Sequence, residues 1–149
     1  MGISMYNEEN IIDPTPCIAI ANIENKRKRE IAELKKHRPL VYICSPFAGD
    51  VQVNVKAARK YCRFAVNEGK IPFAPHLLFT QFLNDKKPFE RELGMVFGNI
   101  MMGKCTEVWV FGETISPGMH SEIEYAKERH YRIRFFNKRL EEVPPKCVI

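Results

Sequence analysis

EVWVFGETISPGMHSE, which spans residues 107–122, is the stretch that decides the fold, because it leads from a strand through a polar loop into a helix. Its first five residues are mostly apolar, with β-branched and aromatic side chains, which is typical of a buried strand. Ser116 is a good N-cap, and Pro117 suits the first position of a helix. The side of this helix that faces the sheet follows the i, i+3, i+4, i+7 spacing and contains Met119, Glu122, Ile123 and Ala126.

Glu122 is a charged residue on an otherwise apolar stripe, so we expect its carboxylate to point into the protein. A buried carboxylate without a partner is costly, and its pKa is usually shifted. Position alone leaves two interpretations open. The carboxylate takes part in chemistry at the end of a strand, or it is a partly buried glutamate that a neighbouring Lys, Arg or Tyr satisfies.

Strands and helices alternate from residue 39 onwards. We expect strands at residues 40–44, 71–74, 107–111 and 132–136. We expect helices at residues 51–68, at 118–129, and in two pieces at 77–103, divided near Lys87 and Pro88. Such an order implies right-handed crossovers and a parallel sheet covered on both faces. The expected fold class is α/β, a three-layer flavodoxin/Rossmann-like arrangement with a short, mainly parallel sheet of four to five strands.

The chain has 149 residues and 45% hydrophobic content, which is enough for one domain with a sizeable core. We expect an N-terminal extension with a basic helix at residues 1–38, the domain at 39–138 and a C-terminal tail at 139–149. The longest uncharged stretches fall short of the roughly 20 apolar residues that a membrane-spanning helix needs, and no secretory signal is recognisable. We therefore expect a soluble protein without a membrane partner.

Five cysteines are present, and no two of them form a C-x-x-C pair. Cys44, Cys62 and Cys105 fall at expected core positions, so we interpret them as reduced thiols of a cytoplasmic protein. No cluster of His, Cys or carboxylates has the spacing of metal ligands, so we expect no metal and no cofactor.

The net charge of +5 is concentrated in residues 24–38, where seven Lys or Arg stand against three Glu. This segment is expected to be a helix in which Ile31 and Leu34 dock on the body of the protein. A solvated helix face and a phosphate-binding arm are the two interpretations of its charge, of which we favour the first. Residues 1–23, with Pro14 and Pro16, show no clear period, so we expect an arm that is disordered or packed on a partner subunit.

Candidate ligand residues, several of them polar, gather after the expected strands, at the edge of the sheet where ligands bind in such folds. Four of them follow the first strand, namely Ser45, Pro46, Phe47 and Asp50. His76 follows the second strand, and Ser116, Gly118 and Met119 open the helix that bears Glu122. That helix start offers free backbone amides to an anion. Asp50 is equally explained as a helix N-cap.

Three segments, VYICSPFAGD, the PH of FAPHLLF, and VWVFGETISPGMHSEIEYA, resemble the nucleoside 2-deoxyribosyltransferase superfamily. The similarity covers about residues 40–137. It implies that Glu122 attacks the anomeric carbon of a nucleoside and holds a glycosyl-enzyme ester, before transfer or hydrolysis. The matching site positions are Tyr42, which orients Glu122 or the sugar, with Ser116, Gly118 and a histidine at position 76. The resemblance also implies a homo-oligomer in which a neighbour completes each site.

Two departures from that family concern the leaving base and the phosphate. Many members carry an aspartate in the helix before the third strand, but FGNIMMGKCTEVWV has none; Asn99 is the nearest polar candidate and Glu92 lies further back. The general acid therefore stays unassigned. Nucleotide-specific relatives place an arginine in the first loop, where this chain has Phe47 and Ala48. Arg91 is a candidate either as a substrate ligand or as a partner for Glu122.

A rival hypothesis is a non-catalytic module that binds a nucleotide or a nucleotide-derived signal in the same crevice. Missing acid chemistry favours that hypothesis. A nucleic-acid-binding protein is the third and least favoured hypothesis, because no aromatic platform with interleaved basic residues accompanies the basic segment.

Overall fold

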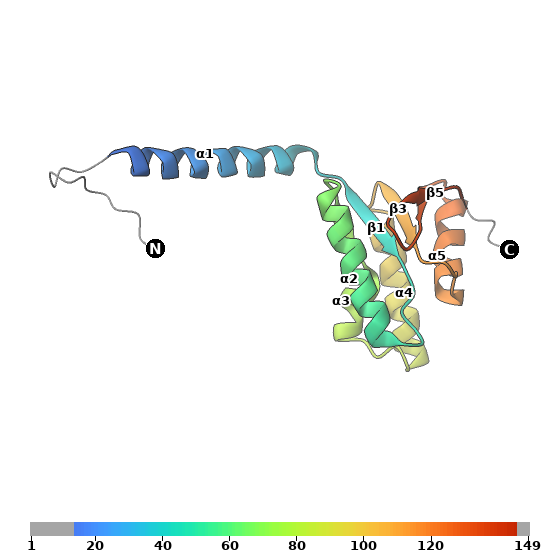
Figure 1. Cartoon of the computed structure of the whole chain (residues 1–149). Helices are drawn as coiled ribbons and strands as arrows, with labels where there is room; N and C mark the ends of the chain where they lie inside the picture. The colour runs from blue at the N-terminus through green and yellow to red at the C-terminus, as the bar shows by residue number, and fades with distance from the viewer. Residues whose placement is uncertain (1–13, 146–149) are drawn as a thin grey trace. The chain divides into compact units, whose positions relative to one another are not determined.

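Figure 1 shows the computed structural model, which describes residues 14–145 of the chain. The chain forms two compact units, residues 1–38 and residues 39–149. In the first unit the described element is α1 (Pro14–His37). The second unit contains β1 (Leu40–Cys44), α2 (Val51–Asn67), β2 (Ile71–Phe73), α3 (Pro75–Leu78), the 3-10 helix η1 (Phe79–Gln81), α4 (Pro88–Met102), β3 (Glu107–Phe111), α5 (Pro117–Glu128), β4 (Arg132–Phe136) and β5 (Glu142–Val143).

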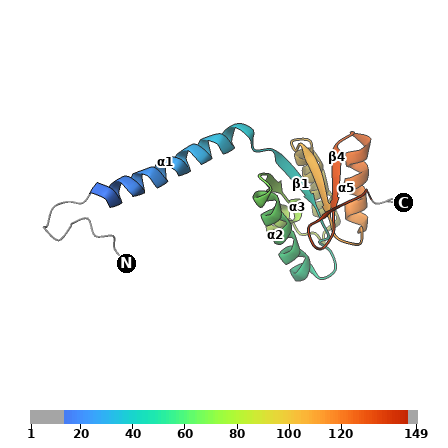
Figure 2. The same ribbon diagram turned by 45° about the horizontal axis from the view of Figure 1, so that its top comes forward.

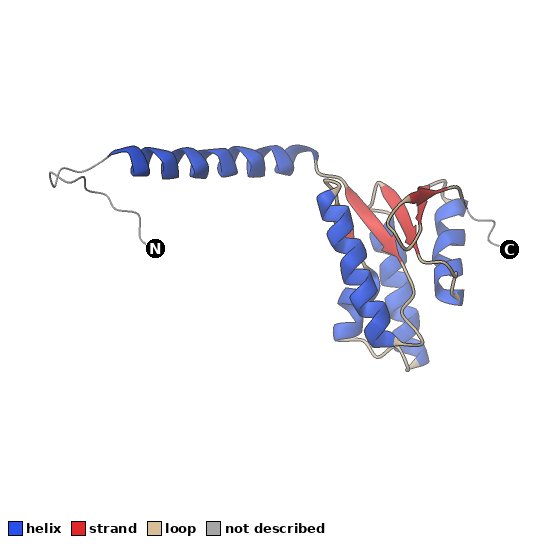
Figure 3. Cartoon of the chain, viewed as in Figure 1, coloured by secondary structure: helices blue, strands red, loops and turns tan. Residues whose placement is uncertain are grey.

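The sheet has five strands in the order β2-β1-β3-β4-β5. The first three pairs are parallel, and β5 joins the edge antiparallel to β4. Figure 3 shows the strands in red between the blue helices. Pro72 lies in the edge strand β2, where a missing N–H costs no central hydrogen bond. The expected α/β class with a mainly parallel sheet is therefore confirmed.

Helices cover both faces of the sheet because successive side chains of each strand point to opposite sides. The face toward α2 has a core of Val41, Ile43, Tyr61, Ala65, Ala74, Trp109, Phe111 and Phe136. The face toward α4 and α5 has a core of Tyr42, Cys44, Met102, Val108, Val110, Met119, Ile123, Ala126 and Phe135. Figure 2 shows α2 and α5 on opposite sides of the strands. The expected three-layer arrangement is thus present.

The expected helix over residues 77–103 is wrong in its first piece. Only a single turn, α3, and the 3-10 turn η1 form before residue 82, and α4 begins at Pro88. Local hydrogen bonds explain the break, because the Asn84 side chain accepts from Lys86 N at 3.0 Å and Glu90 Oε2 accepts from Asn84 N at 3.1 Å. This irregular segment becomes one wall of the site.

The expectation of disorder is wrong for residues 14–23, which form the first turns of α1, whereas packing of this segment on a partner subunit stays a prediction. Pro14 and Pro16 fit there because the first N–H groups of a helix have no intrahelical acceptor. Residues 1–13 lie outside the described part of the chain. Ile31 and Leu34 are exposed by 54% and 44%, so their expected docking stays a prediction.

Within residues 14–145 no helix combines the length and the apolar character needed to cross a membrane. Of the cysteines in this range, Cys44 is buried, Cys62 and Cys105 are partly buried, and Cys17 is exposed, all of them unpaired. Burial raises the pKa of both Cys62 and Cys105 to about 11, which keeps these two thiols protonated near neutral pH.

Candidate functional site

The sheet changes its direction of winding between β1 and β3. The chain leaves β1 toward β2 on one side, and it leaves β3 toward β4 on the other. Loops that leave adjacent parallel strands in opposite directions open a crevice beyond the carboxyl ends of those strands. Ser45 directly follows β1 there, and Gly112, with φ +108°, starts the loop after β3.

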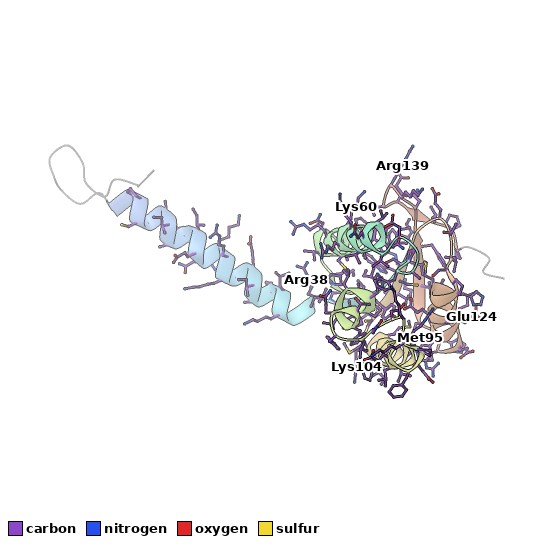
Figure 4. The ribbon with its side chains drawn as sticks, turned by 90° about the horizontal axis from the view of Figure 1, so that it is seen from below. Arg38, Lys60, Met95, Lys104, Glu124 and Arg139 are labelled. Atoms are coloured by element: carbon purple, nitrogen blue, oxygen red, sulfur yellow. The ribbon has the colours of Figure 1, made fainter. Side chains whose placement is uncertain are left out.

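A cavity of about 290 Å³ occupies this crevice. Four segments supply its walls: the loop after β1, the turns after β2, the inner side of α4 and the start of α5. The lining residues are Ser45, Phe47, Ala48, Pro75, His76, Phe79, Thr80, Leu83, Asp85, Glu90, Arg91, Gly94, Met95, Asn99, Ser116, Pro117, Gly118, Met119, Ser121 and Glu122. Figure 4 labels Met95, which belongs to the α4 wall. The volume is close to the lower end of the range for small-molecule sites.

Glu122 lies half-buried at this cavity, and its carboxylate is held from the sheet side. The hydroxyl of Tyr42, a fully buried β1 side chain, donates to Glu122 Oε1 at 2.7 Å. The helix that bears Glu122 is fixed at its start, because Ser116 Oγ, as the N-cap of α5, accepts a hydrogen bond from Met119 N at 3.3 Å. The expected inward orientation of Glu122 therefore holds, and its neighbour is a tyrosine.

Gly98 of α4 permits this contact. A Cβ at position 98 would stand 3.1 Å from Tyr42 Oη and 3.6 Å from Pro75 Cβ. Such a distance is tighter than ordinary van der Waals contact, so a side chain at position 98 would press on the hydroxyl that binds Glu122. The glycine thus allows α4 to approach β1 closely at the site.

The environment of Glu122 shifts its proton affinity. Burial raises the pKa of Glu122 to about 6, and hydrogen bonding by Cys44 and Tyr42 partly opposes that rise. Burial, followed by the nearby Glu122 carboxylate, raises the pKa of Tyr42 well above its usual value. Glu122 is therefore the group of this pair that ionises near neutral pH.

On another wall of the cavity lies a second polar pair, which joins β1 to the residues after β2. Ser45 Oγ and His76 Nε2 are 3.1 Å apart, and the ring of Phe47 lies 5.7 Å from the His76 ring. Burial lowers the pKa of His76 to about 4, so its imidazole is neutral at physiological pH. The Thr80 hydroxyl donates to the backbone oxygen of His76 and holds this turn in place.

Asn54 and Asp50 shape the loop after β1 rather than the cavity surface. Asn54 Nδ2 donates to the carbonyl oxygens of Phe47 and Ala48, each at 3.0 Å. Asp50 Oδ1 accepts from Val53 N at 3.2 Å as the N-cap of α2, which agrees with one of the two explanations left open. Asp50 and Pro46 are absent from the described cavity lining, whereas the other predicted ligands are in it.

Arg91 lines the cavity from α4, next to Glu90 and close in sequence to Asp85. Among the described residues no ion pair joins Arg91 to Glu122, and the role of Arg91 as a substrate ligand stays a prediction. Most of this wall, including Phe79, Asp85, Glu90 and Met95, carries no recognisable motif in the sequence. The segment before α4 is irregular, and the α4 residues that line the cavity are a mixture of polar and apolar side chains. Neither part therefore shows a periodic pattern in the sequence that indicates a site.

Three further observations bear on the family and on metals. The model of a protein family described as a domain of unknown function (DUF7768) matches residues 39–136, which include the sheet through β4 and the whole cavity lining. No curated protein matches the chain. Within the part of the chain that the structure describes, no three His, Cys, Asp or Glu side chains lie together as metal ligands would.

Proposed function

The chain belongs to the DUF7768 family, and we propose that it cleaves the N-glycosidic bond of a nucleoside or nucleotide through Glu122. One observation carries the proposal. Glu122 is a carboxylate with a pKa near 6 that faces the cavity and is held there by Tyr42 at 2.7 Å. A positioned carboxylate in a crevice is what attack on a sugar carbon requires.

The proposed reaction proceeds in two halves. A Glu122 oxygen forms a bond to the anomeric carbon while the bond to the base nitrogen breaks, and the base departs with that electron pair. The resulting ester is then attacked by water or by a second base, which returns the electron pair to the carboxylate. Tyr42 orients Glu122 for the first half by holding Oε1.

Other lining residues support substrate binding in this proposal. Phe47 and Phe79 supply apolar and aromatic surface for a planar base. The neutral His76, paired with Ser45, offers a hydrogen bond to a sugar hydroxyl. The Ser116 hydroxyl and the free amides at the start of α5 suit a 5′-phosphate where the substrate is a nucleotide.

The test follows base release by chromatography from a panel of ribonucleosides, deoxyribonucleosides, their 5′-monophosphates and NAD, with and without a free acceptor base. Wild-type protein is compared with Glu122→Gln and with Glu124→Gln. Glu124 lies on the same helix but pairs with Lys127 at 3.2 Å on the surface, so its variant is the matched control. Release by wild type and Glu124→Gln but not by Glu122→Gln supports the proposal. Binding of a panel member without release contradicts it and favours the binding module.

We also propose that the protein is a cytoplasmic homo-oligomer. α4 carries apolar residues on the side turned away from the sheet, where Phe89, Val96 and Ile100 are exposed by 70%, 47% and 57%. An exposed apolar side of a helix often marks a protein–protein contact, which supports coverage of this side by a second copy. Light scattering of wild type and of Val96→Glu measures the oligomeric state, and a wild-type monomer contradicts this part. The unpaired cysteines support a reducing compartment.

A further inference from the structure

The cavity places a carboxylate nucleophile in reach of a substrate, and neither His76 nor Asn99 of its lining has a proton to give to a departing base. A neutral nucleobase leaves as an anion unless an acid gives it a proton, and such help is worth roughly 10²- to 10⁴-fold in rate. His76 is neutral because burial lowers its pKa to about 4. Asn99, on α4, is an amide and carries no acidic proton. The proton of Tyr42 is directed to Glu122.

The charges of the cavity lining also disfavour a base that leaves as an anion. Among the described residues around the cavity, Asp85, Glu90 and Glu122 carry carboxylates, and Arg91 is the one residue with a permanent positive charge. Glu90 is held in place, since its Oε2 accepts from Asn84 N at 3.1 Å. An excess of carboxylates in a cleft raises the local concentration of cations and disfavours anionic leaving groups.

Aromatic surface is present beside these carboxylates. Phe47 and Phe79 both line the cavity, and Phe47 lies against His76 with 5.7 Å between ring centroids. The face of an aromatic ring attracts a cation, an effect worth about 0.5–2 kcal/mol depending on solvent exclusion. A flat, positively charged base would therefore meet both rings and carboxylates in this cavity.

We propose that the preferred substrates are nucleosides whose base carries a positive charge, such as N7-alkylated purine nucleosides or pyridinium nucleosides. The inference rests on the proposed function and names its substrate class. When a Glu122 oxygen bonds to the anomeric carbon, the electron pair of the broken C–N bond neutralises the cationic ring. The base leaves neutral, without a proton from the protein. Water then attacks the same carbon, the ester bond returns its electron pair to Glu122, and the proton of the water passes to solvent.

Matched substrate pairs test this inference on the full chain. One pair is 7-methylguanosine against guanosine, together with the corresponding 2′-deoxynucleosides. The other is nicotinamide riboside against its neutral 1,4-dihydro form. We expect kcat/KM for each cationic member to exceed that of its neutral counterpart by about 100-fold or more, because the missing acid penalises the neutral base alone.

Binding is measured separately in Glu122→Gln, which should not turn the nucleosides over. There, 7-methylguanosine should bind several-fold more tightly than guanosine, and adding Asp85→Asn should weaken the binding of 7-methylguanosine more than the binding of guanosine. Equal binding of the two nucleosides would overturn the charge argument.

The outcomes separate the two levels of the argument. Release from the cationic members alone supports the inference. Release from both members within about tenfold of each other, lost in Glu122→Gln, overturns the inference while the proposed function stands. Release from neither member overturns the inference, and absence of release from the whole nucleoside and nucleotide panel overturns the proposed function as well.

Discussion

Replacing Glu122 by Gln should abolish base release and at the same time make the stability of the protein less dependent on pH. Glutamine keeps the size of the side chain and an oxygen that accepts from Tyr42, but it cannot ionise. The folded protein holds the Glu122 proton more tightly than the unfolded chain, because burial raises the pKa from 4.5 to about 6. The stability that the neutral carboxyl contributes is therefore fully present below pH 4.5 and is lost as the pH rises through about 6.

The size of this effect follows from the pKa difference. At about 1.4 kcal/mol per pKa unit, a rise from 4.5 to about 6 corresponds to a loss of about 2 kcal/mol in the wild type. Glu122→Gln should escape this loss. The difference in unfolding free energy between variant and wild type should therefore shift in favour of the variant by roughly 2 kcal/mol from about pH 4.5 to about pH 7.5.

Urea unfolding of both proteins at the two pH values measures this double difference, in which all other titrating groups cancel. Glu124→Gln serves as the control, because the Glu124 side chain is 43% exposed and its pair with Lys127 should contribute no more than about 1 kcal/mol. A double difference near zero for Glu122→Gln, or one of opposite sign, would refute the claim that Glu122 is ionised against a burial penalty.

Three further changes test the supports of the site. Tyr42→Phe removes the 2.7 Å hydrogen bond to Glu122 and should lower the unfolding free energy by about 1–3 kcal/mol. The curve of kcat/KM against pH should have its midpoint near the Glu122 pKa of about 6 in wild type and at higher pH in the variant. An unmoved midpoint would speak against the pairing of Tyr42 with Glu122. Gly98→Ala places a Cβ 3.1 Å from Tyr42 Oη and should lower kcat about tenfold or more. In the control Gly94→Ala, the new Cβ meets only Leu83, at 3.8 Å, and the variant should be more stable than wild type in thermal unfolding by up to about 1 kcal/mol. Equal kcat in wild type and Gly98→Ala would refute the claim that α4 must approach Tyr42 closely. Asp50→Ala removes the N-cap of α2 and should cost about 0.5–2 kcal/mol in urea unfolding; an unchanged unfolding free energy with a raised KM would instead favour a substrate contact.

Much of the sheet was predictable from the sequence because its strands are short, apolar and clearly bounded. The spans 40–44, 107–111 and 132–136 coincide with β1, β3 and β4. The stripe that contains Met119, Ile123 and Ala126 is buried on α5, as its spacing predicts. Where a helix or strand buries one face, the spacing of its apolar residues alone indicates which side packs against the rest of the protein.

The α4 wall of the site was not predictable in the same way. Its residues come together through tertiary packing, in which Gly98 lets the helix approach Tyr42, and through a local turn that Asn84 and Glu90 stabilise. Neither feature has a period along the sequence. Helix formation at residues 14–23 was not predictable for a different reason, since this segment shows no clear period along the sequence, although its two prolines fit the first turn of a helix.

Mass spectrometry of the protein, quenched in acid during turnover of a nucleoside that supports base release, tests the central claim most directly. The account predicts that a fraction of the chain gains the mass of the sugar, that this mass maps to the peptide containing Glu122, and that Glu122→Gln shows neither the adduct nor base release. A sugar on another residue, or base release by Glu122→Gln at the wild-type rate, would contradict it.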